Sequence, residues 1–370
     1  MGKDTRTPEQ KRADQKAQLE SMHVQLTEAV EGLVTGQDWR KAVEFAARFR
    51  KRSFNNVLLI RSQHLQAYQE GRVPGPEPTY VAGFTQWKQL GRSPQKGAYK
   101  IYAPVTSRFA SATPRDPDSW RKLATGEKAR PGESVTTKKT GNRIASVWDV
   151  SQTTGDPLPE RPRPQLLHGQ APDGLWDGLA RIVEQEGYRL LDAPDAASIG
   201  GADGATDLRA KTVQVRLDLD EMDRCATLAH ELGHLVLLPK DGADAVGHVG
   251  IGEVEAESFS LMVAAAHGVD TTKYSVPYVS GWASTVPGST PAEVMRATGE
   301  RVRQAARSVL DRLETVQVPD GDPPGLDREA LRASSRAATS RRTATRSGRD
   351  RSTPQAGARP STPPAQELGL

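Results

Sequence analysis

The segment from Asp220 to Leu238 restricts the fold of this chain most, because its apolar residues recur at helical spacing around two histidines. His230 and His234 stand four positions apart in the run His-Glu-Leu-Gly-His, so a helix presents both imidazoles on one face. Such a pair can bind one metal ion, and Glu231 is placed to act as general base toward a metal-bound water. Gly233 would let a neighbouring segment approach closely.

A catalytic metal site needs a third protein ligand, and the acidic run that starts at Glu253 supplies candidates. Helical spacing places Glu253 and Glu257 on one face and Glu255 elsewhere. This ligand set suits Zn²⁺, although Mn²⁺ or Co²⁺ would accept it too. The competing interpretation is that the histidines are ordinary helix residues and the glutamates a solvated face. For His248 and His267, surface or packing roles are favoured over ligation.

The composition points to a cytoplasmic protein. No stretch reaches the length of an apolar membrane span, and the first residues lack the apolar run of a signal peptide. The single cysteine, Cys225, cannot form an internal disulfide, which fits a reducing compartment. With 370 residues, the chain is long enough for two domains plus tails.

In the first half of the chain, helical and strand patterns alternate. Residues 5–52 read as helix, interrupted near Gly36, with Asp38 as the cap of the second part. Residues 97–104 and 144–150 alternate like two paired, half-buried strands. The polar, Lys- and Arg-rich stretch 106–143 between them is predicted to be a long mobile loop that would order on an acidic partner.

In the second half, the patterns predict a helix from Leu175, strands at 189–191 and 212–217, and helices around 220–238, 253–267 and 292–316. We therefore predict an α+β protein with two folded domains. Its parts are a helical extension (1–34), an α+β domain (35–158), a linker (159–172), a mainly helical domain (173–317), and a disordered Arg-, Ser- and Pro-rich tail (318–370).

The N-terminal domain interleaves cations with aromatic rings, a pattern typical of proteins that bind single strands through phosphate contacts and base stacking. The alternative, equally weighted on composition, is that its aromatic residues are core and its cations merely solvated. The candidate DNA-binding residues are Arg48, Arg50, Lys51, Arg52, Asn55, Trp87, Arg92, Lys96 and Tyr102.

Several motifs resemble those of ArdC-type antirestriction proteins. SFNNVLLIRSQ, TYVAGFTQWKQLGR, KGAYKIYAPV and VWDVSQTTG look like their single-stranded-DNA-binding N-terminal domain. TLAHELGH, EVEAESF and TKYSVPYVSGW, within residues 212–282, resemble the ImmA/IrrE-like metallopeptidases and the C-terminal domain of ArdC-type proteins. The resemblance covers most of residues 35–315, although the stretch 106–143 is longer than expected.

The resemblance implies a zincin-like second domain, and it selects Glu253 as third ligand and leaves Glu257 as a supporting residue or substitute. The segment between the two metal-site helices, KDGADAVGHVGIG, lacks the aromatic and basic residues expected of close ArdC relatives, so substrate contacts there do not carry over.

The leading hypothesis is a zinc-dependent metalloendopeptidase coupled to a single-stranded-DNA-binding domain, with an unidentified peptide or protein substrate and no membrane partner. The alternative is a non-catalytic protein that protects DNA by binding single strands, with a structural or vestigial zinc site. The Arg-rich tail would either add nonspecific nucleic-acid affinity or only solubilise the chain.

Overall fold

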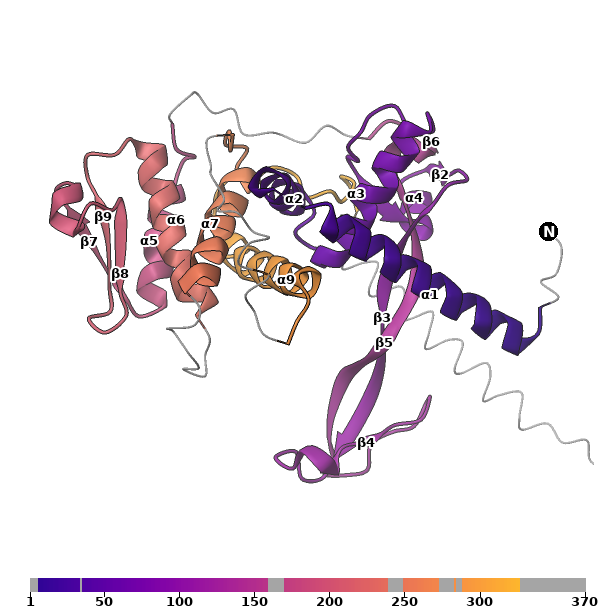
Figure 1. Ribbon diagram of the computed structural model, residues 1–370. Helices are drawn as coiled ribbons and strands as arrows, with labels where there is room; N and C mark the ends of the chain where they lie inside the picture. The colour runs from indigo at the N-terminus through magenta and orange to yellow at the C-terminus, as the bar shows by residue number, and fades with distance from the viewer. Residues whose placement is uncertain are drawn as a thin grey trace, which may run out of the picture. The chain divides into compact units, whose positions relative to one another are not determined.

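The computed structural model describes residues 6–33, 35–158, 170–238, 249–272, 283 and 288–326 (Figure 1). It combines helices with antiparallel and mixed sheets, so the predicted α+β class is confirmed. Contacts divide the described residues into two units, one formed by those within 6–105 and 140–326 and the other by 106–139. Among the described helices, none is long and apolar enough to cross a membrane.

The first unit begins with three helices that follow hydroxyl caps. These are α1 (Pro8–Glu31), α2 (Gly36–Arg48) and α3 (Phe54–Gln69). The prediction that Asp38 caps α2 is wrong by three positions, because Thr35 is the N-cap. Asp38 instead completes a capping box, since its Oδ2 accepts a 3.0 Å hydrogen bond from the Thr35 amide.

A four-stranded sheet of order β1-β5-β3-β4 follows. Both strands predicted at 97–104 and 144–150 form, within β3 and β5. The sheet consists of β1 (Val81–Gly83), β3 (Tyr99–Ser111), β4 (Arg121–Lys122) and β5 (Ser134–Asp149). Around it lie α4 (Phe84–Gln89), β2 (Arg92–Pro94), η1 (Pro117–Ser119), η2 (Val150–Gln152) and β6 (Thr153–Gly155), with β2 and β6 paired antiparallel.

Helix α3 covers part of the β3 edge with two side-chain amides. Asn56 accepts a hydrogen bond from the Tyr102 amide (2.9 Å) and donates one to the Tyr102 carbonyl (2.8 Å). Gln63, two turns further along α3, makes the same pair of contacts with Lys100 at 2.8 and 2.9 Å. These amides stand in for a neighbouring strand, so the backbone groups at this edge do not lack partners.

We predict that Asn56→Leu destabilises the fold by roughly 1–3 kcal/mol, because the variant keeps the volume but leaves two backbone groups of Tyr102 without partners. Urea unfolding of the variant and of Asn55→Leu, whose side chain makes no such pair with β3, measures this difference. Equal stabilities of the two variants would contradict the edge-capping role of Asn56.

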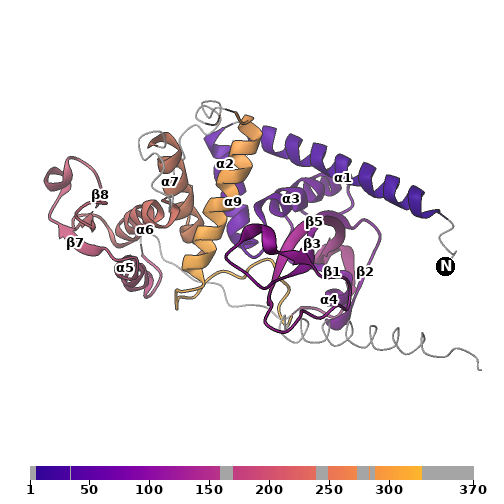
Figure 2. The same ribbon diagram turned by 90° about the horizontal axis from the view of Figure 1, so that it is seen from below.

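The second half of the unit stacks in layers around α6 (Figures 1 and 2). The three-stranded sheet has the order β7-β9-β8, with β9 parallel to β7 and antiparallel to β8. Its elements are α5 (Leu175–Gln185), β7 (Arg189–Ala193), η3 (Ala196–Ile199), β8 (Gly204–Asp207), β9 (Thr212–Arg216), α6 (Glu221–Leu237), α7 (Val249–Ala266) and α9 (Pro291–Leu310). Helix α6 packs against α5 and the sheet on one side and α7 on the other.

The N-terminal helices share a core with these later elements. The buried Trp39 of α2 donates a 2.8 Å hydrogen bond from its indole to the Ser258 hydroxyl of α7. The Phe54 amide at the start of α3 donates to Glu300 of α9 at 2.7 Å. Most of the predicted linker, residues 159–169, lies outside the described residues. The division into domains 35–158 and 173–317 therefore stays a prediction.

The stretch 106–143 contains the second part of β3, all of β4 and the first part of β5, joined by turns and η1, so the prediction of a long mobile loop is wrong. Strands β3 and β5 continue into it, and β4 pairs with β3 at Phe109 and Ala110. Arg121 forms ion pairs with Glu127 (2.5 Å) and Glu133 (2.8 Å). Backbone hydrogen bonds between strands and these ion pairs order the segment. Its low apolar content, from which disorder was predicted, therefore does not prevent a defined structure.

The first residues of the predicted tail are ordered as well. The Val318 amide donates to the Ala266 carbonyl at 2.7 Å, and the Gly321 carbonyl accepts from the Val81 amide at 2.8 Å. Asp320 forms a 2.8 Å ion pair with Lys51. The prediction of disorder from residue 318 is thus wrong up to residue 326, and the remainder of the tail lies outside the described residues.

His267 has a packing role, as expected. Its side chain is fully buried, with Nδ1 2.8 Å from the Val263 carbonyl and Nε2 2.7 Å from the Thr315 hydroxyl. Because a carbonyl only accepts, Nδ1 carries the proton and Nε2 of the neutral ring accepts from Thr315. Burial lowers the pKa of His267.

We predict that this histidine makes stability depend on pH. The unfolded chain protonates a histidine near pH ~6.5, whereas folded His267 resists protonation, so the unfolded state binds more protons below that pH. Its contribution is complete above pH ~6.5 and is lost as the pH falls toward the lower folded-state pKa. Urea unfolding in chelator at pH 7.5 and 5.5 should show a smaller loss for His267→Gln than for wild type; equal losses would contradict this.

Candidate metal centre

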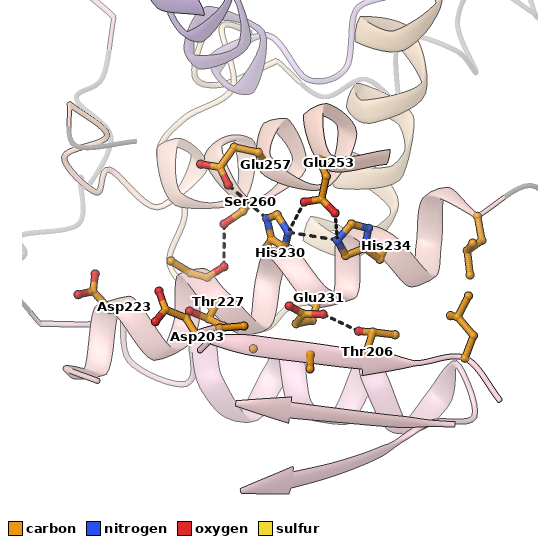
Figure 3. A pocket seen from close by; sticks show the side chains of 16 residues that line it. Asp203, Thr206, Asp223, Thr227, His230, Glu231, His234, Glu253, Glu257 and Ser260 are labelled. Carbon is orange, nitrogen blue, oxygen red and sulfur yellow. Dashed lines mark hydrogen bonds and ion pairs between the residues drawn. The ribbon is translucent and has the colours of Figure 1, made fainter. Parts of the chain in front are cut away.

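Helices α6 and α7 bring three candidate ligands to one point (Figure 3). The Nε2 atoms of His230 and His234 lie 3.1 Å apart. The Glu253 carboxylate places Oε2 3.4 Å from His230 Nε2 and Oε1 3.6 Å from His234 Nε2. All three ligand atoms lie within 4.8 Å of one another. The residues that the sequence analysis named as ligands therefore converge in space.

The spacing of these atoms fits one small cation. Two donors that each lie about 2.0–2.2 Å from a tetrahedral ion are separated by roughly 3.3–3.6 Å. The observed separations of 3.1, 3.4 and 3.6 Å fall close to this range. The Glu253 side chain is 55% exposed, so the site opens to solvent on that side, as a site that admits water and substrate requires.

Glu257 orients one of the histidines. Its Oε2 lies 3.2 Å from His230 Nδ1, the ring nitrogen that points away from Glu253. A proton on Nδ1 donated to this carboxylate leaves Nε2 free to bind a metal. Burial opposes the charged form of His230, but the bond to Glu257 and the nearby carboxylates outweigh burial and raise the pKa of His230. For His234, burial and the neighbouring His230 lower the pKa.

Glu231 lies next to His230 on the part of α6 that faces β8. Its carboxylate is buried, and Oε2 accepts a 2.6 Å hydrogen bond from the Thr206 hydroxyl of β8 (Figure 3). Burial raises the pKa of Glu231, and the hydrogen bond from Thr206 opposes this shift. Thr206 thus holds the candidate base in one orientation. No sequence motif indicated Thr206, because this residue lies in β8 and is separated along the chain from α6 by a turn and the whole of β9.

Two glycines allow neighbouring segments to reach α6. A Cβ at Gly233 would lie 2.9 Å from Ala256 Cα, so α7 approaches α6 at the position where the sequence analysis expected a close neighbour. A Cβ at Gly204 of β8 would lie 2.6 Å from the Thr227 methyl and 2.9 Å from Glu231 Oε1. The lack of side chains at both points sets the distance of α7 and β8 from α6.

The site opens into a cavity of about 870 Å³ between β8, α6 and α7. Among the described residues, the charged side chains that line it, apart from the two histidines, are all acidic: Asp203, Asp223, Glu231, Glu253 and Glu257. Thr206, Thr227 and Ser260 add hydroxyls, and Leu208 and Leu238 add apolar surface. A cavity of this volume accommodates a ligand of several residues or a drug-sized molecule.

Comparison with known proteins bears on the N-terminal half. Residues 16–147 match the family model described as the N-terminal domain of the anti-restriction factor ArdC. These residues are thus similar to the ArdC N-terminal domain. The predicted resemblance is thereby confirmed for the part of the chain that carries the N-terminal motifs.

One curated protein and two crystal structures are also similar to this chain. An uncharacterized protein of Bacillus anthracis, pXO2-81, is 27% identical over 299 residues, which cover 75% of this chain and 48% of the relative. The chain thus spans about half the length of that relative. Crystal structures of the antirestriction ArdC protein from the R388 plasmid, metal-free and Mn(II)-bound, share 18% and 17% identity with TM-scores of 0.42 and 0.40. They cover 70% of this chain, which spans 84% and 83% of theirs.

The structure places several candidate DNA-binding residues in the interior of the ArdC-like part. Trp87 is fully buried and donates its indole proton to the Trp148 carbonyl at 3.0 Å, so it offers no face for base stacking. Arg92 is 9% exposed and bonds to Thr153 and Gly155. Both were predicted to contact DNA, and in this conformation neither can, because the aromatic and cationic groups are used inside the fold.

The cations near residue 50 are paired within the protein. Arg48 forms a 2.7 Å ion pair with Glu77, and Lys51 pairs with Asp320. Arg50 donates to the Val318 carbonyl at 3.3 Å, and Arg52 donates to the Val81 carbonyl. Asn55 and Tyr102 are half-buried, whereas Lys96 is exposed. Of the predicted DNA-binding residues, Lys51 and Lys96 are exposed, and Lys51 is the one that pairs with Asp320.

We predict that Gly233→Ala weakens metal binding about tenfold or more. Its Cβ would force α7, with Glu253, away from the two histidines, and such overpacking costs about 1–3 kcal/mol. Gly252→Ala, one residue before Glu253, is the matched control, because a Cβ there meets nothing within 4 Å. Calorimetric titration of both variants with Zn²⁺ tests this; equal affinities would show that the α6–α7 approach does not position Glu253.

Proposed function

We propose that this chain is a zinc-dependent metallopeptidase whose N-terminal half binds single-stranded DNA, in an antirestriction-like role. The observation that carries the enzymatic part is the convergence of His230 Nε2, His234 Nε2 and the Glu253 carboxylate, with Glu231 buried beside them. Two imidazoles, one carboxylate and an adjacent glutamate are the groups that zinc peptidases use.

The protein's own residues divide the work as follows. His230, His234 and Glu253 would hold the ion, and Glu257 would keep His230 in the ligating tautomer. The chemistry that a bound Zn²⁺ supplies in such sites is activation of a water molecule and polarisation of a carbonyl. Glu231, held by Thr206, would accept a proton from the attacking water and pass it to the leaving amine.

The shape of the cavity supports a peptide substrate. Strand β8 stands at the end of the order β7-β9-β8, and its residues Gly204 to Thr206 line the cavity beside α6. An extended peptide can add to such a strand edge by main-chain hydrogen bonds. The acidic lining would favour peptides with cationic side chains over acidic ones.

The DNA-binding part is supported by the match of residues 16–147 to the ArdC N-terminal domain. Because that match does not include the metal-binding helix, it also favours a second candidate function. In it, the protein protects DNA by binding single strands, and the metal centre has a structural role only.

One comparison separates the two candidates. Wild type and Glu231→Gln should both retain about one Zn²⁺ per chain, whereas His230→Ala should retain little, because Glu231 is a base and not a ligand. Elemental analysis after purification without chelators or a histidine tag measures this. Mass spectrometry of peptide mixtures incubated with each protein should then show cleavage by wild type, reduced about 10²–10⁴-fold in Glu231→Gln.

The outcomes are distinct. Zinc-loaded wild type that cleaves nothing, together with DNA protection that survives Glu231→Gln, would favour the binding protein. Cleavage that survives Glu231→Gln would remove this residue from the mechanism. Absence of metal in wild type would contradict the zinc centre itself.

A further inference from the structure

An aromatic pair lies at the surface of the ArdC-like part, next to the buried Trp87. Phe84, the first residue of α4, is 51% exposed. Its ring meets that of Trp148 of β5 edge to face, with centroids 6.0 Å apart and planes at 63°. Phe84 and Trp87 are three positions apart in α4, and only Trp87 enters the core. Phe84 and Trp148 thus bring two aromatic rings together at the surface, where a flat ligand can stack on them.

The fold holds this pair in place. The Trp148 indole donates a 2.7 Å hydrogen bond to the Gln95 carbonyl, which fixes its ring plane. Ala82, which precedes Phe84 by two residues, pairs with Trp148 in the β1–β5 ladder. A pre-oriented pair loses little side-chain entropy when a ligand ring stacks on it.

Lys88 lies beside the pair, and Lys96 and Lys100 are linked to it through neighbouring residues. Lys88 Nζ lies 5.9 Å from the centre of the Phe84 ring and donates to Ser93 at 2.7 Å. Lys100 donates to the Ser146 hydroxyl at 2.9 Å, and Ser146 is on the same face of β5 as Trp148, two residues away. The exposed Lys96 follows Gln95, the residue that anchors the Trp148 indole.

We propose that Phe84 and Trp148, with Lys88, Lys96 and Lys100, form the stacking surface for single-stranded DNA, an inference that rests on the DNA-binding part of the proposed function. Unpaired bases expose flat faces that stack on aromatic rings, while lysines contact the backbone phosphates. A duplex hides its base faces inside the helix and would contact only the lysines. We call these five residues the Phe84–Trp148 surface.

The test measures binding of a fluorescein-labelled oligothymidine, and of a duplex of equal length, by anisotropy at several salt concentrations. Phe84→Ala should weaken single-strand binding about tenfold or more, and Phe84→Trp should retain it, because a larger ring also stacks. Tyr68→Ala is the matched control, since Tyr68 is 43% exposed on α3, outside the surface. Lys88→Gln should reduce the slope of log affinity against log salt concentration by about one, because one phosphate contact is lost.

Each result decides something. Unchanged thermal unfolding of Phe84→Ala with lost binding supports the surface. Wild type that binds single strands, and a Phe84→Ala variant that binds them as tightly, would overturn this inference and leave the proposed function standing. Wild type that binds no single strands would overturn both this inference and the DNA-binding part of the proposed function. Equal loss for Tyr68→Ala and Phe84→Ala would show that the effect is not specific to this surface.

Discussion

The close approach of α6 and α7 at Gly233 is the contact on which the candidate metal centre depends. The histidines belong to α6 and the carboxylates to α7, so no ligand set exists unless the two helices touch. Ala256 backbone atoms occupy the space where any other residue at 233 would place its Cβ. On the opposite side, Gly204 lets β8 reach α6 and brings Thr206 to Glu231. Helix α6, which carries the candidate ligands, is thus held between two contacts that only glycine permits.

The N-terminal helices support the same arrangement. Trp39 of α2 is buried against α7 and hydrogen-bonds Ser258, the residue after Glu257. Because Trp39 lies within the residues that match the ArdC N-terminal domain, that domain supplies packing for the helix that carries the carboxylates. The two proposed activities therefore do not reside in independent halves of the chain. Helix α7 packs against the N-terminal helix α2 and also carries Glu253 and Glu257 of the candidate metal centre.

Sequence reasoning succeeded where structure is local and failed where it is not. The helix around His230 and the strands near 100 and 147 follow from periodicity alone. Trp87 and Phe84 are both aromatic residues of one short helix, and nothing in their order tells which one faces the core. The stretch 106–139 forms strands through backbone pairing and the ion pairs of Arg121, which a search for apolar alternation does not detect. Asp320, assigned to a disordered tail, is instead bound by Lys51.

The sequence by itself determined the helix with His230, Glu231 and His234, because the relative direction of side chains four positions apart is a property of the helix. It also limited the third ligand to an acidic face of the following helix. Helical spacing left Glu253 and Glu257 as alternatives, and the family resemblance favoured Glu253. The tertiary structure brings Glu253 to both imidazoles and Glu257 to the far nitrogen of His230, and it alone decided that Thr206 holds Glu231. These assignments depend on how closely separate segments pack, and periodicity shows which face of a helix is buried but not which residue it meets.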